Sequence, residues 1–152
     1  LNRWEEIKRE EKGDEAKPYL HGVGKGLPAV LRAGKLQKKA GKVGFDWPDL
    51  VGVVAKIDEE LKEVKDELPT NGEVATPALE AEVGDLLFSV VNLARKLGVD
   101  PEAALEGTNV KFEDRFAVME RELLARGNSL KDASLEEMES GWVRAKSLSS
   151  EG

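Results

Sequence analysis

Two groups of acidic residues, in neighbouring segments, have the types and the spacing needed to bind a divalent cation. Glu59 and Glu60 precede Glu63 by four and three positions, and Glu82 precedes Asp85 by three. Residues three or four positions apart lie on the same side of an α-helix. Carboxylate oxygens are the ligands that Mg²⁺ prefers. If both segments are helical and pack together, these five carboxylates form an oxygen-rich metal site.

The first acidic segment has the pattern of an amphipathic helix. Its apolar residues recur at steps of three and four: Leu50, Val54, Ile57, Leu61, Val64 and Leu68. This period predicts a helix with one buried apolar stripe, flanked by the acids and Lys56. Like charges this close repel one another unless a cation lies between them. A Glu-rich run with interleaved lysines is also typical of an ordinary solvated face.

The second acidic segment is almost wholly apolar apart from one line of polar residues. Glu82, Asp85, Ser89 and Asn92 follow this line. The other positions are Leu86, Leu87, Phe88, Val90, Val91, Leu93, Ala94 and Leu97. A helix that is apolar nearly all round belongs at the centre of a fold. Buried carboxylates there must be paired or bound to metal, so we expect a central helix over residues 78–97 that faces the first acidic helix.

Turn residues and prolines delimit the elements before the acidic segments. We expect a short charged helix over residues 1–12 and a loop over residues 13–26. A helix should then begin with Pro28 in its first turn and end near Gly44. Its buried side carries Ala33, Leu36, Ala40 and Val43. The break Phe45-Asp-Trp-Pro48 places the start of the acid-bearing helix at one of the two residues before the proline.

Two further helices are expected after the acidic segments. Asp100-Pro101 is an N-cap followed by a first-turn proline, and it opens a helix that Gly127 closes. The predicted inward residues of this helix are Leu105, Thr108, Phe112, Phe116, Met119 and Leu123. Ser134-x-x-Glu137 is a capping box that starts a last helix. Its inward face is predicted to carry Leu135, Met138 and Trp142.

The composition limits the possible classes of protein. The chain has 152 residues, no cysteine and a net charge of −7, with 35% of its residues charged. The length suggests one core, and the lack of cysteine excludes disulfides and thiolate metal sites. The acidic balance argues against nucleic-acid binding. Without a signal peptide or an apolar run of membrane length, we expect a cytoplasmic protein with no membrane partner.

No strand pattern or internal repeat is found, so the sequence predicts an all-α fold with a four-helix-bundle-like core and helical additions at both ends. The central helix needs more apolar cover than its three neighbours supply. We therefore expect an obligate homo-oligomer. The chain begins at Leu1 and not at Met, which is consistent with a piece of a longer protein.

The acidic residues and their flanking phrases resemble the MazG family of all-α nucleoside triphosphate pyrophosphohydrolases. The signature is Glu59-Glu60-x-x-Glu63 followed by Glu82-x-x-Asp85. The flanking phrases are Asn2-Arg-Trp-Glu-Glu-Ile-Lys, Gly26-Leu-Pro-Ala, Leu36-Gln-Lys-Lys, Val43-Gly-Phe-Asp-Trp47, Gly84-Asp-Leu-Leu-Phe88, Val91-Asn-Leu-Ala-Arg95 and Lys111-Phe-x-x-Arg-Phe116. The resemblance covers nearly the whole chain and is closest to the C-terminal half of the two-domain MazG proteins. It suggests an N-terminal helix and linker over residues 1–26 and a MazG-like catalytic domain over residues 27–152.

The resemblance implies Mg²⁺-dependent hydrolysis of (deoxy)nucleoside triphosphates to the monophosphate and pyrophosphate, with Mn²⁺ as a possible substitute. The residues that would hold the metal and the attacking water are Glu59, Glu60, Glu63, Glu82 and Asp85. Those at nucleotide- and phosphate-binding positions are Lys56, Asn92, Lys111, Arg115, Trp142 and Lys146. Related proteins form dimers. Ala78 and Ala81 depart from the family pattern, because relatives can carry a Lys and a second acid there.

Other functions stay open at this point. A dUTP or phosphoribosyl-ATP pyrophosphohydrolase of the same superfamily is the nearest alternative enzyme, and a helical interaction module with a structural metal also fits the pattern. Lys111 and Arg115 are four residues apart, as they would be on an ordinary solvated face. Trp142 fits core packing as well as stacking on a base. Because no Ser, Cys or His is placed for a covalent intermediate, we expect direct attack by water.

Overall fold

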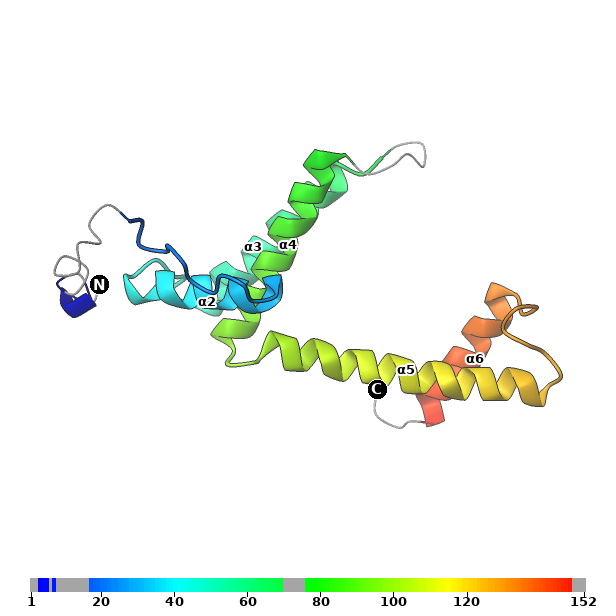
Figure 1. Cartoon of the computed structure of the whole chain (residues 1–152). Helices are drawn as coiled ribbons and strands as arrows, with labels where there is room; N and C mark the ends of the chain where they lie inside the picture. The colour runs from blue at the N-terminus through cyan, green and yellow to red at the C-terminus, as the bar shows by residue number, and fades with distance from the viewer. Residues whose placement is uncertain (1–2, 6, 8–16, 70–75, 149–152) are drawn as a thin grey trace. The chain divides into compact units, whose positions relative to one another are not determined.

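The computed structural model describes residues 3–5, 7, 17–69 and 76–148. Its regular elements over these residues are helices without any strand, which confirms the predicted all-α class. They are α2 (Ala29–Lys42), α3 (Leu50–Asp66), α4 (Pro77–Lys96), α5 (Pro101–Ala125) and α6 (Leu135–Leu148) (Figure 1). Most of the helix expected over residues 1–12 lies outside the described residues. None of the described helices combines the length and the hydropathy needed to cross a membrane.

The chain divides into two compact units, Leu1–Glu102 and Ala103–Gly152. The first unit holds α2, α3 and α4, and the second holds nearly all of α5 and the whole of α6. The predicted boundary between an N-terminal helix and linker (residues 1–26) and a catalytic domain (residues 27–152) is a different division. It concerns which residues carry the activity, and the compactness of the two units does not test this, so it stays a prediction.

Helix α4 is central to the first unit, as its apolar sequence predicted. It packs against both α2 and α3, and it lies beside α3 along most of its length (Figure 1). Val53 of α3 and Leu79 and Val91 of α4 are buried. A polar link joins α2 to the same helix, because the Gln37 side chain donates from Nε2 to the carbonyl of Phe88 over 2.9 Å.

The ends of α3 and α4 are capped by side chains. Asp49 accepts from the Gly52 amide at 3.3 Å, and Thr76 accepts from the Leu79 amide at 3.2 Å. The predicted start of α3 before Pro48 is therefore wrong. Proline pushes the preceding residue toward extended backbone, and the carboxylate after it caps the helix instead.

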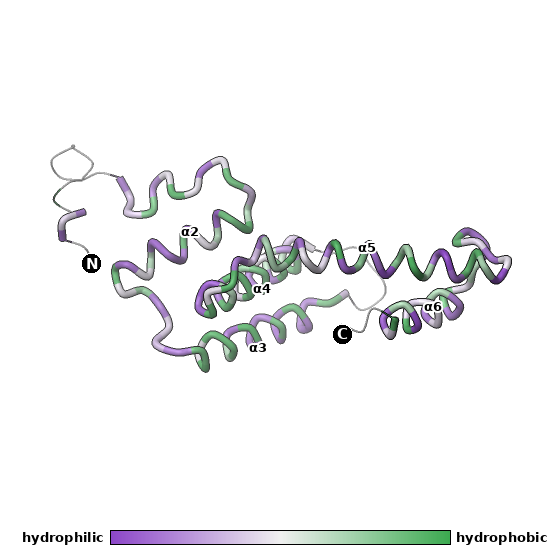
Figure 2. Tube along the Cα trace, turned by 90° about the horizontal axis from the view of Figure 1, so that it is seen from below, coloured by the Kyte–Doolittle hydropathy of each residue, from purple (hydrophilic) through white to green (hydrophobic). Residues whose placement is uncertain are grey.

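The apolar stripe predicted to be buried on α3 is largely exposed in the single chain. Leu50, Val54, Leu61 and Leu68 are each at least 40% exposed. Among the described helices of this unit α3 packs only on α4, and the side that meets α4 carries Val53 and Glu60. The stripe points elsewhere, as do Val83, Leu87 and Val90 of α4, which are each at least 41% exposed. Figure 2 shows the apolar residues along both helices in green.

In the second unit α6 packs against the C-terminal half of α5. Met119, Leu123 and Ala145 are buried, and the helices cross closely at Gly141, where an added Cβ would lie 2.8 Å from Met119 Cγ. The predicted capping box is confirmed. The Ser134 amide donates to Glu137 over 2.9 Å, and the Glu137 amide donates to the Ser134 hydroxyl over 3.1 Å.

Four residues predicted to face inward in the second unit do not. Leu105 and Phe112 of α5 are 53% and 58% exposed, Thr108 between them is also exposed, and Leu135 of α6 is 71% exposed. The inward face of α6 instead includes Gly141 and Ala145. Since α6 meets α5 around Met119, it leaves the first turns of α5 uncovered.

Candidate functional site

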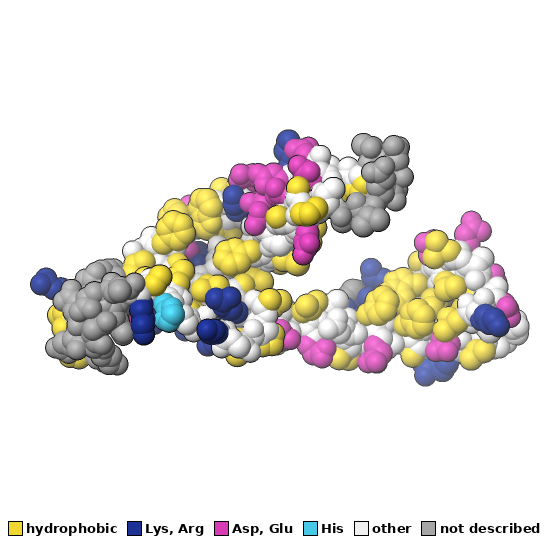
Figure 3. Space-filling view, turned by 45° about the horizontal axis from the view of Figure 1, so that its top comes forward, with side chains coloured by type: hydrophobic (Ala, Val, Ile, Leu, Met, Phe, Trp, Pro, Cys, Tyr) yellow, Lys and Arg dark blue, Asp and Glu magenta, His cyan; other side chains and the backbone are white. Residues whose placement is uncertain are grey.

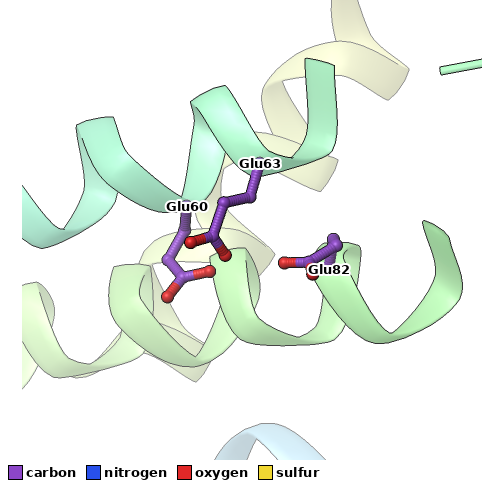
Figure 4. A group of neighbouring side chains, drawn as sticks. All are labelled: Glu60, Glu63 and Glu82. Atoms are coloured by element: carbon purple, nitrogen blue, oxygen red, sulfur yellow. The ribbon is translucent and has the colours of Figure 1, made fainter. Parts of the chain in front are cut away.

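Three of the predicted acids meet between α3 and α4. Glu60 and Glu63, one turn apart on α3, reach toward α4, and Glu82 reaches back from α4 (Figure 4). One carboxylate oxygen from each lies within 4.8 Å of the other two. Glu60 is buried, and Glu63 and Glu82 are half-buried. We call these three residues the acidic cluster.

Lys56 is the cation that accompanies the acidic cluster on α3. Its Nζ lies 3.0 Å from Glu60 Oε1 and 3.6 Å from Glu59 Oε2. The hydrogen bond to Glu60 is the main reason that the pKa of Lys56 is raised. Its positive charge therefore balances one oxygen of the cluster and leaves the other oxygens uncompensated.

Two oxygens of the cluster are buried and have no hydrogen-bond partner among the described residues. They are Glu60 Oε2 and Glu82 Oε2. A buried charged oxygen without a partner is costly, and such groups usually coordinate a cation or share a proton. The oxygen-only donor set fits a hard cation such as Mg²⁺ better than a soft metal.

The proton affinity of Glu63 reflects the same crowding. Its pKa is raised to about 7, first by a hydrogen bond shared with Glu82 and then by the negative charge of Glu60. Without a cation, the Glu63 carboxyl is therefore partly protonated near neutral pH. A divalent cation can replace this proton, because metal and proton compete for the same oxygens.

The remaining predicted ligands lie outside the acidic cluster. Glu59 is about 100° round the helix from Glu60; its side chain is 57% exposed and pairs with Lys56. Asp85 is also exposed, one turn after Glu82 on α4. Acidic side chains gather on the surface of the first unit (Figure 3). The metal-binding roles of Glu59 and Asp85 stay predictions.

A mostly apolar cavity of about 620 Å³ lies in the first unit. Its walls include Phe45 and Trp47 from the loop between α2 and α3, together with Val53 and Phe88. Lys56 also lines it. Because Lys56 bonds directly to Glu60, the cavity and the acidic cluster adjoin.

One wall of the cavity is fixed by a network of polar side chains. Arg95 donates to Asn92 Oδ1 from Nε at 3.0 Å and from Nη2 at 2.9 Å. It also forms a salt bridge of 2.7 Å with Asp46. This hydrogen bond is the main reason that the pKa of Asp46 is lowered. Lys96 donates to the Trp47 carbonyl at 2.8 Å, so α4 holds the loop over residues 45–47 from two sides.

Sequence reasoning assigned no role to Gln37, Asp46 or Arg95. The burial of Gln37 could have been predicted, because Gln37 is four positions after Ala33 on the buried side of α2. A polar residue among the apolar residues of that side indicates a buried hydrogen bond. Asp46 and Arg95 are 49 residues apart in sequence, so no local pattern connects them.

The other predicted nucleotide-binding residues belong to the second unit. Lys111 and Lys146 are exposed, and Arg115 is only 8% exposed. The Trp142 ring lies 5.2 Å from that of Phe112 between centroids, tilted by 45°. This geometry agrees with the packing alternative for Trp142. The roles of these four residues toward a nucleotide stay predictions.

Comparisons with known proteins point to one family. Residues 52–117, which include all five predicted acids, match the model of the MazG nucleotide pyrophosphohydrolase domain. The chain is 46% identical over 147 residues to a nucleoside triphosphate pyrophosphohydrolase of Escherichia coli (strain K12), covering 96% of this chain and 56% of the relative.

Two further relatives come from other bacteria. The nucleoside triphosphate pyrophosphohydrolase/pyrophosphatase MazG of Thermotoga maritima is 43% identical over 145 residues, covering 95% of this chain and 54% of the relative. The uncharacterized protein YabN of Bacillus subtilis is 44% identical over 149 residues, covering 96% and 29%. The chain thus spans little more than half the length of the two pyrophosphohydrolases.

Proposed function

We propose that the chain hydrolyses (deoxy)nucleoside triphosphates to the monophosphate and pyrophosphate, because residues 52–117 match the model of the MazG nucleotide pyrophosphohydrolase domain and two relatives carry this activity in their names. The observation that carries this proposal is the acidic cluster, in which one oxygen of each residue lies within 4.8 Å of the other two, inside the matched span. Two relatives that align with nearly the whole chain are named as nucleoside triphosphate pyrophosphohydrolases.

Glu60, Glu63 and Glu82 would hold Mg²⁺, or Mn²⁺ in its place, between α3 and α4. Glu59 and Asp85 lie next to them in sequence and would complete the set of ligands. When bound, the cation offsets negative charge on the phosphates and on the leaving pyrophosphate. The two buried, unpartnered oxygens of the cluster support this assignment, since coordination would satisfy both.

The reaction needs only water as the nucleophile. One carboxylate left free of the metal, Glu60 or Glu63, orients a water molecule and takes its proton as the oxygen attacks the α-phosphorus. The bond between the α-phosphorus and the bridging oxygen breaks, and that oxygen leaves with pyrophosphate. Lys56, already beside Glu60, would steady the phosphates by charge-assisted hydrogen bonds. Lys111, Arg115 and Lys146 would do the same, and Asn92 and Trp142 would contact the nucleotide.

The active form would be a dimer with a four-helix-bundle-like core. The exposed apolar residues of α3 and α4 support this, because no described element of the first unit covers them. A second copy of the chain would remove such surface from water at about 25 cal/mol per Å².

The test is pyrophosphate release from a panel of ribo- and deoxynucleoside triphosphates, with Mg²⁺ and with EDTA. We expect metal-dependent release with the monophosphate as co-product. Glu60→Gln and Glu82→Gln should lower the rate by about 100-fold or more, because each removes a ligand charge. Glu80→Gln is the matched control, since Glu80 is exposed on α4 and outside the cluster.

Two results would contradict the proposal in different ways. Full hydrolysis by both cluster variants would show that the metal assignment is wrong. No release from any nucleotide by the folded wild-type protein would favour a helical interaction module.

A further inference from the structure

We propose that the cavity beside the acidic cluster binds the nucleoside part of the substrate, and that Gln37 selects bases that carry an exocyclic amine. This inference rests on the proposed function, because it places a nucleotide whose phosphates lie at the cluster. Gln37 would be a specificity-determining residue that contacts the base.

The cavity adjoins the acidic cluster. Lys56 lines the cavity and is hydrogen-bonded to Glu60, so a ligand held by its phosphates at the cluster can extend past Lys56 into the cavity. Its volume of about 620 Å³ falls within the usual range for small-molecule sites, about 300–1,000 Å³.

The walls suit a flat aromatic group with a few polar atoms. Phe45, Trp47 and Phe88 supply aromatic surface, and Phe45 is 82% exposed, so its ring has surface to offer an occupant. Bases stack favourably on aromatic side chains whatever their sequence, because every base has a flat π-face. Trp47 is held against Gly52, where an added Cβ would meet the ring at 2.7 Å.

Gln37 supplies the selective contact. Its side chain is only 7% exposed and lines the cavity. The Phe88 carbonyl only accepts hydrogen bonds, so the Gln37 side-chain group that faces it must be the NH₂ donor. This hydrogen bond therefore fixes the orientation of the Gln37 amide. Oε1 is thereby left as a buried acceptor without a partner among the described residues.

A buried acceptor of this kind discriminates between bases, because a bound base that cannot donate to it leaves it unpaired at a cost in binding free energy. An amine of adenine, cytosine or guanine would donate to Oε1 and remove that cost. A base with hydrogen in place of the amine would leave the acceptor unsatisfied, and a carbonyl oxygen there would repel it. Sites built to bond one substrate group reject the analogue that lacks it more strongly than apolar pockets reject a missing methylene.

The experiment uses substrate pairs that differ only by an amine. These are ATP and purine riboside triphosphate, CTP and 2-pyrimidinone riboside triphosphate, and GTP and ITP. In the wild-type protein we expect kcat/KM to favour the amine-bearing member of at least one pair by about tenfold or more. In Gln37→Met this ratio should fall to about one.

Lys38→Met is the matched control, because Lys38 is the next residue of α2 and is exposed. It should keep the wild-type ratio. Wild-type ratios near one for all three pairs would overturn the proposal, and this test needs no variant to fold. A ratio that survives unchanged in folded Gln37→Met would overturn it as well.

Binding in EDTA separates this inference from the proposed function. Calorimetry would compare AMP with purine riboside monophosphate, and likewise the two monophosphates of the other pairs. Preference for the amine without any pyrophosphate release would support the cavity assignment and contradict the proposed function. Pyrophosphate release without a preference for the amine would support the proposed function and contradict the cavity assignment.

Discussion

Glu63 is the residue whose protonation should be most visible in solution. Its pKa of about 7 in the folded protein lies above the ordinary value of 4.5, so the folded protein holds the proton more tightly than the unfolded chain does. Between these two values the unfolded state binds fewer protons. The contribution of Glu63 to stability therefore falls as the pH rises from about 4.5 to 7.

We predict that Glu63→Gln removes this loss of stability. In EDTA, the melting temperature of the variant minus that of the wild type should increase as the pH is raised from 4.5 to 7. Above pH 7 this difference should stay constant. Differential scanning calorimetry at half-unit pH steps measures it. Asp58→Asn is the control, because Asp58 is exposed on the same helix and outside the cluster. A constant difference across this range would contradict the assigned pKa.

Asp46 and Arg95 form the clearest interaction between residues that are distant in sequence. Their side chains are 25% and 21% exposed, and the shortest bond between them is 2.7 Å. We predict a coupling energy of about 1 kcal/mol in a double-mutant cycle of Asp46→Asn and Arg95→Met at pH 7. Urea denaturation of the four proteins measures it.

The coupling should weaken at low pH. The pKa of Asp46 is lowered by Arg95, so the pair contributes fully above the ordinary value of 3.8 and loses its contribution as the pH falls through the lower folded value. An equal coupling energy at pH 7 and pH 2.5 would show that the contact is not ionic.

At the scale of single helices, the cap of α6 offers a local test. The Ser134 hydroxyl accepts from the Glu137 amide at 3.1 Å, and its loss leaves this amide without that partner. We predict that Ser134→Ala lowers the free energy of unfolding by about 1 kcal/mol. Ser140→Ala, at an exposed position within α6, should have little effect. Chemical denaturation followed by circular dichroism distinguishes them, and equal losses would contradict the capping role.

Local signals explain what could be predicted at this scale. The Ser134 capping box and the proline after Asp100 act within one turn, so sequence alone located both helix starts. The pairing of Glu60 and Glu63 with Glu82 was also accessible, because the acids of an amphipathic helix and the single polar line of the otherwise apolar α4 have few ways to pack. Glu59 shows the limit, since one step along α3 turns it away from α4 and into solvent.

Which face of a helix is buried depends on the element that packs against it. The periodicity of apolar residues within one segment does not identify that element. Val54 and Leu61 fit an apolar stripe, yet the face of α3 that packs on α4 carries Val53 and Glu60 instead. Gln37 is buried on an apolar face because its partner is a carbonyl on another helix, 51 residues away. The spacing of residues within one segment cannot reveal either partner.

At the scale of the whole molecule, the exposed stripes of α3 and α4 predict self-association. We expect the wild-type protein to sediment as a dimer or a larger species. Val54→Lys and Leu87→Lys, which place a charge on 46% and 60% exposed apolar positions, should shift it toward the monomer.

The control for self-association is Glu67→Lys. Glu67 is exposed at the C-terminal end of α3, where a cation suits the helix dipole, so this change should leave the sedimentation coefficient unaltered. Sedimentation velocity at micromolar concentrations is the measurement. A monomeric wild-type protein would show that the stripes are covered in some other way.

The crossing at Gly141 constrains the order in which the sequence of the second unit can change. Any side chain at position 141 would meet Met119 Cγ at 2.8 Å, and Met119 is only 2% exposed, so it has little room to move. A smaller residue at position 119 would have to appear first. The two positions are therefore epistatic, and the accessible mutational route is directional: Met119 can shrink while Gly141 is kept, whereas Gly141 cannot grow while Met119 is kept.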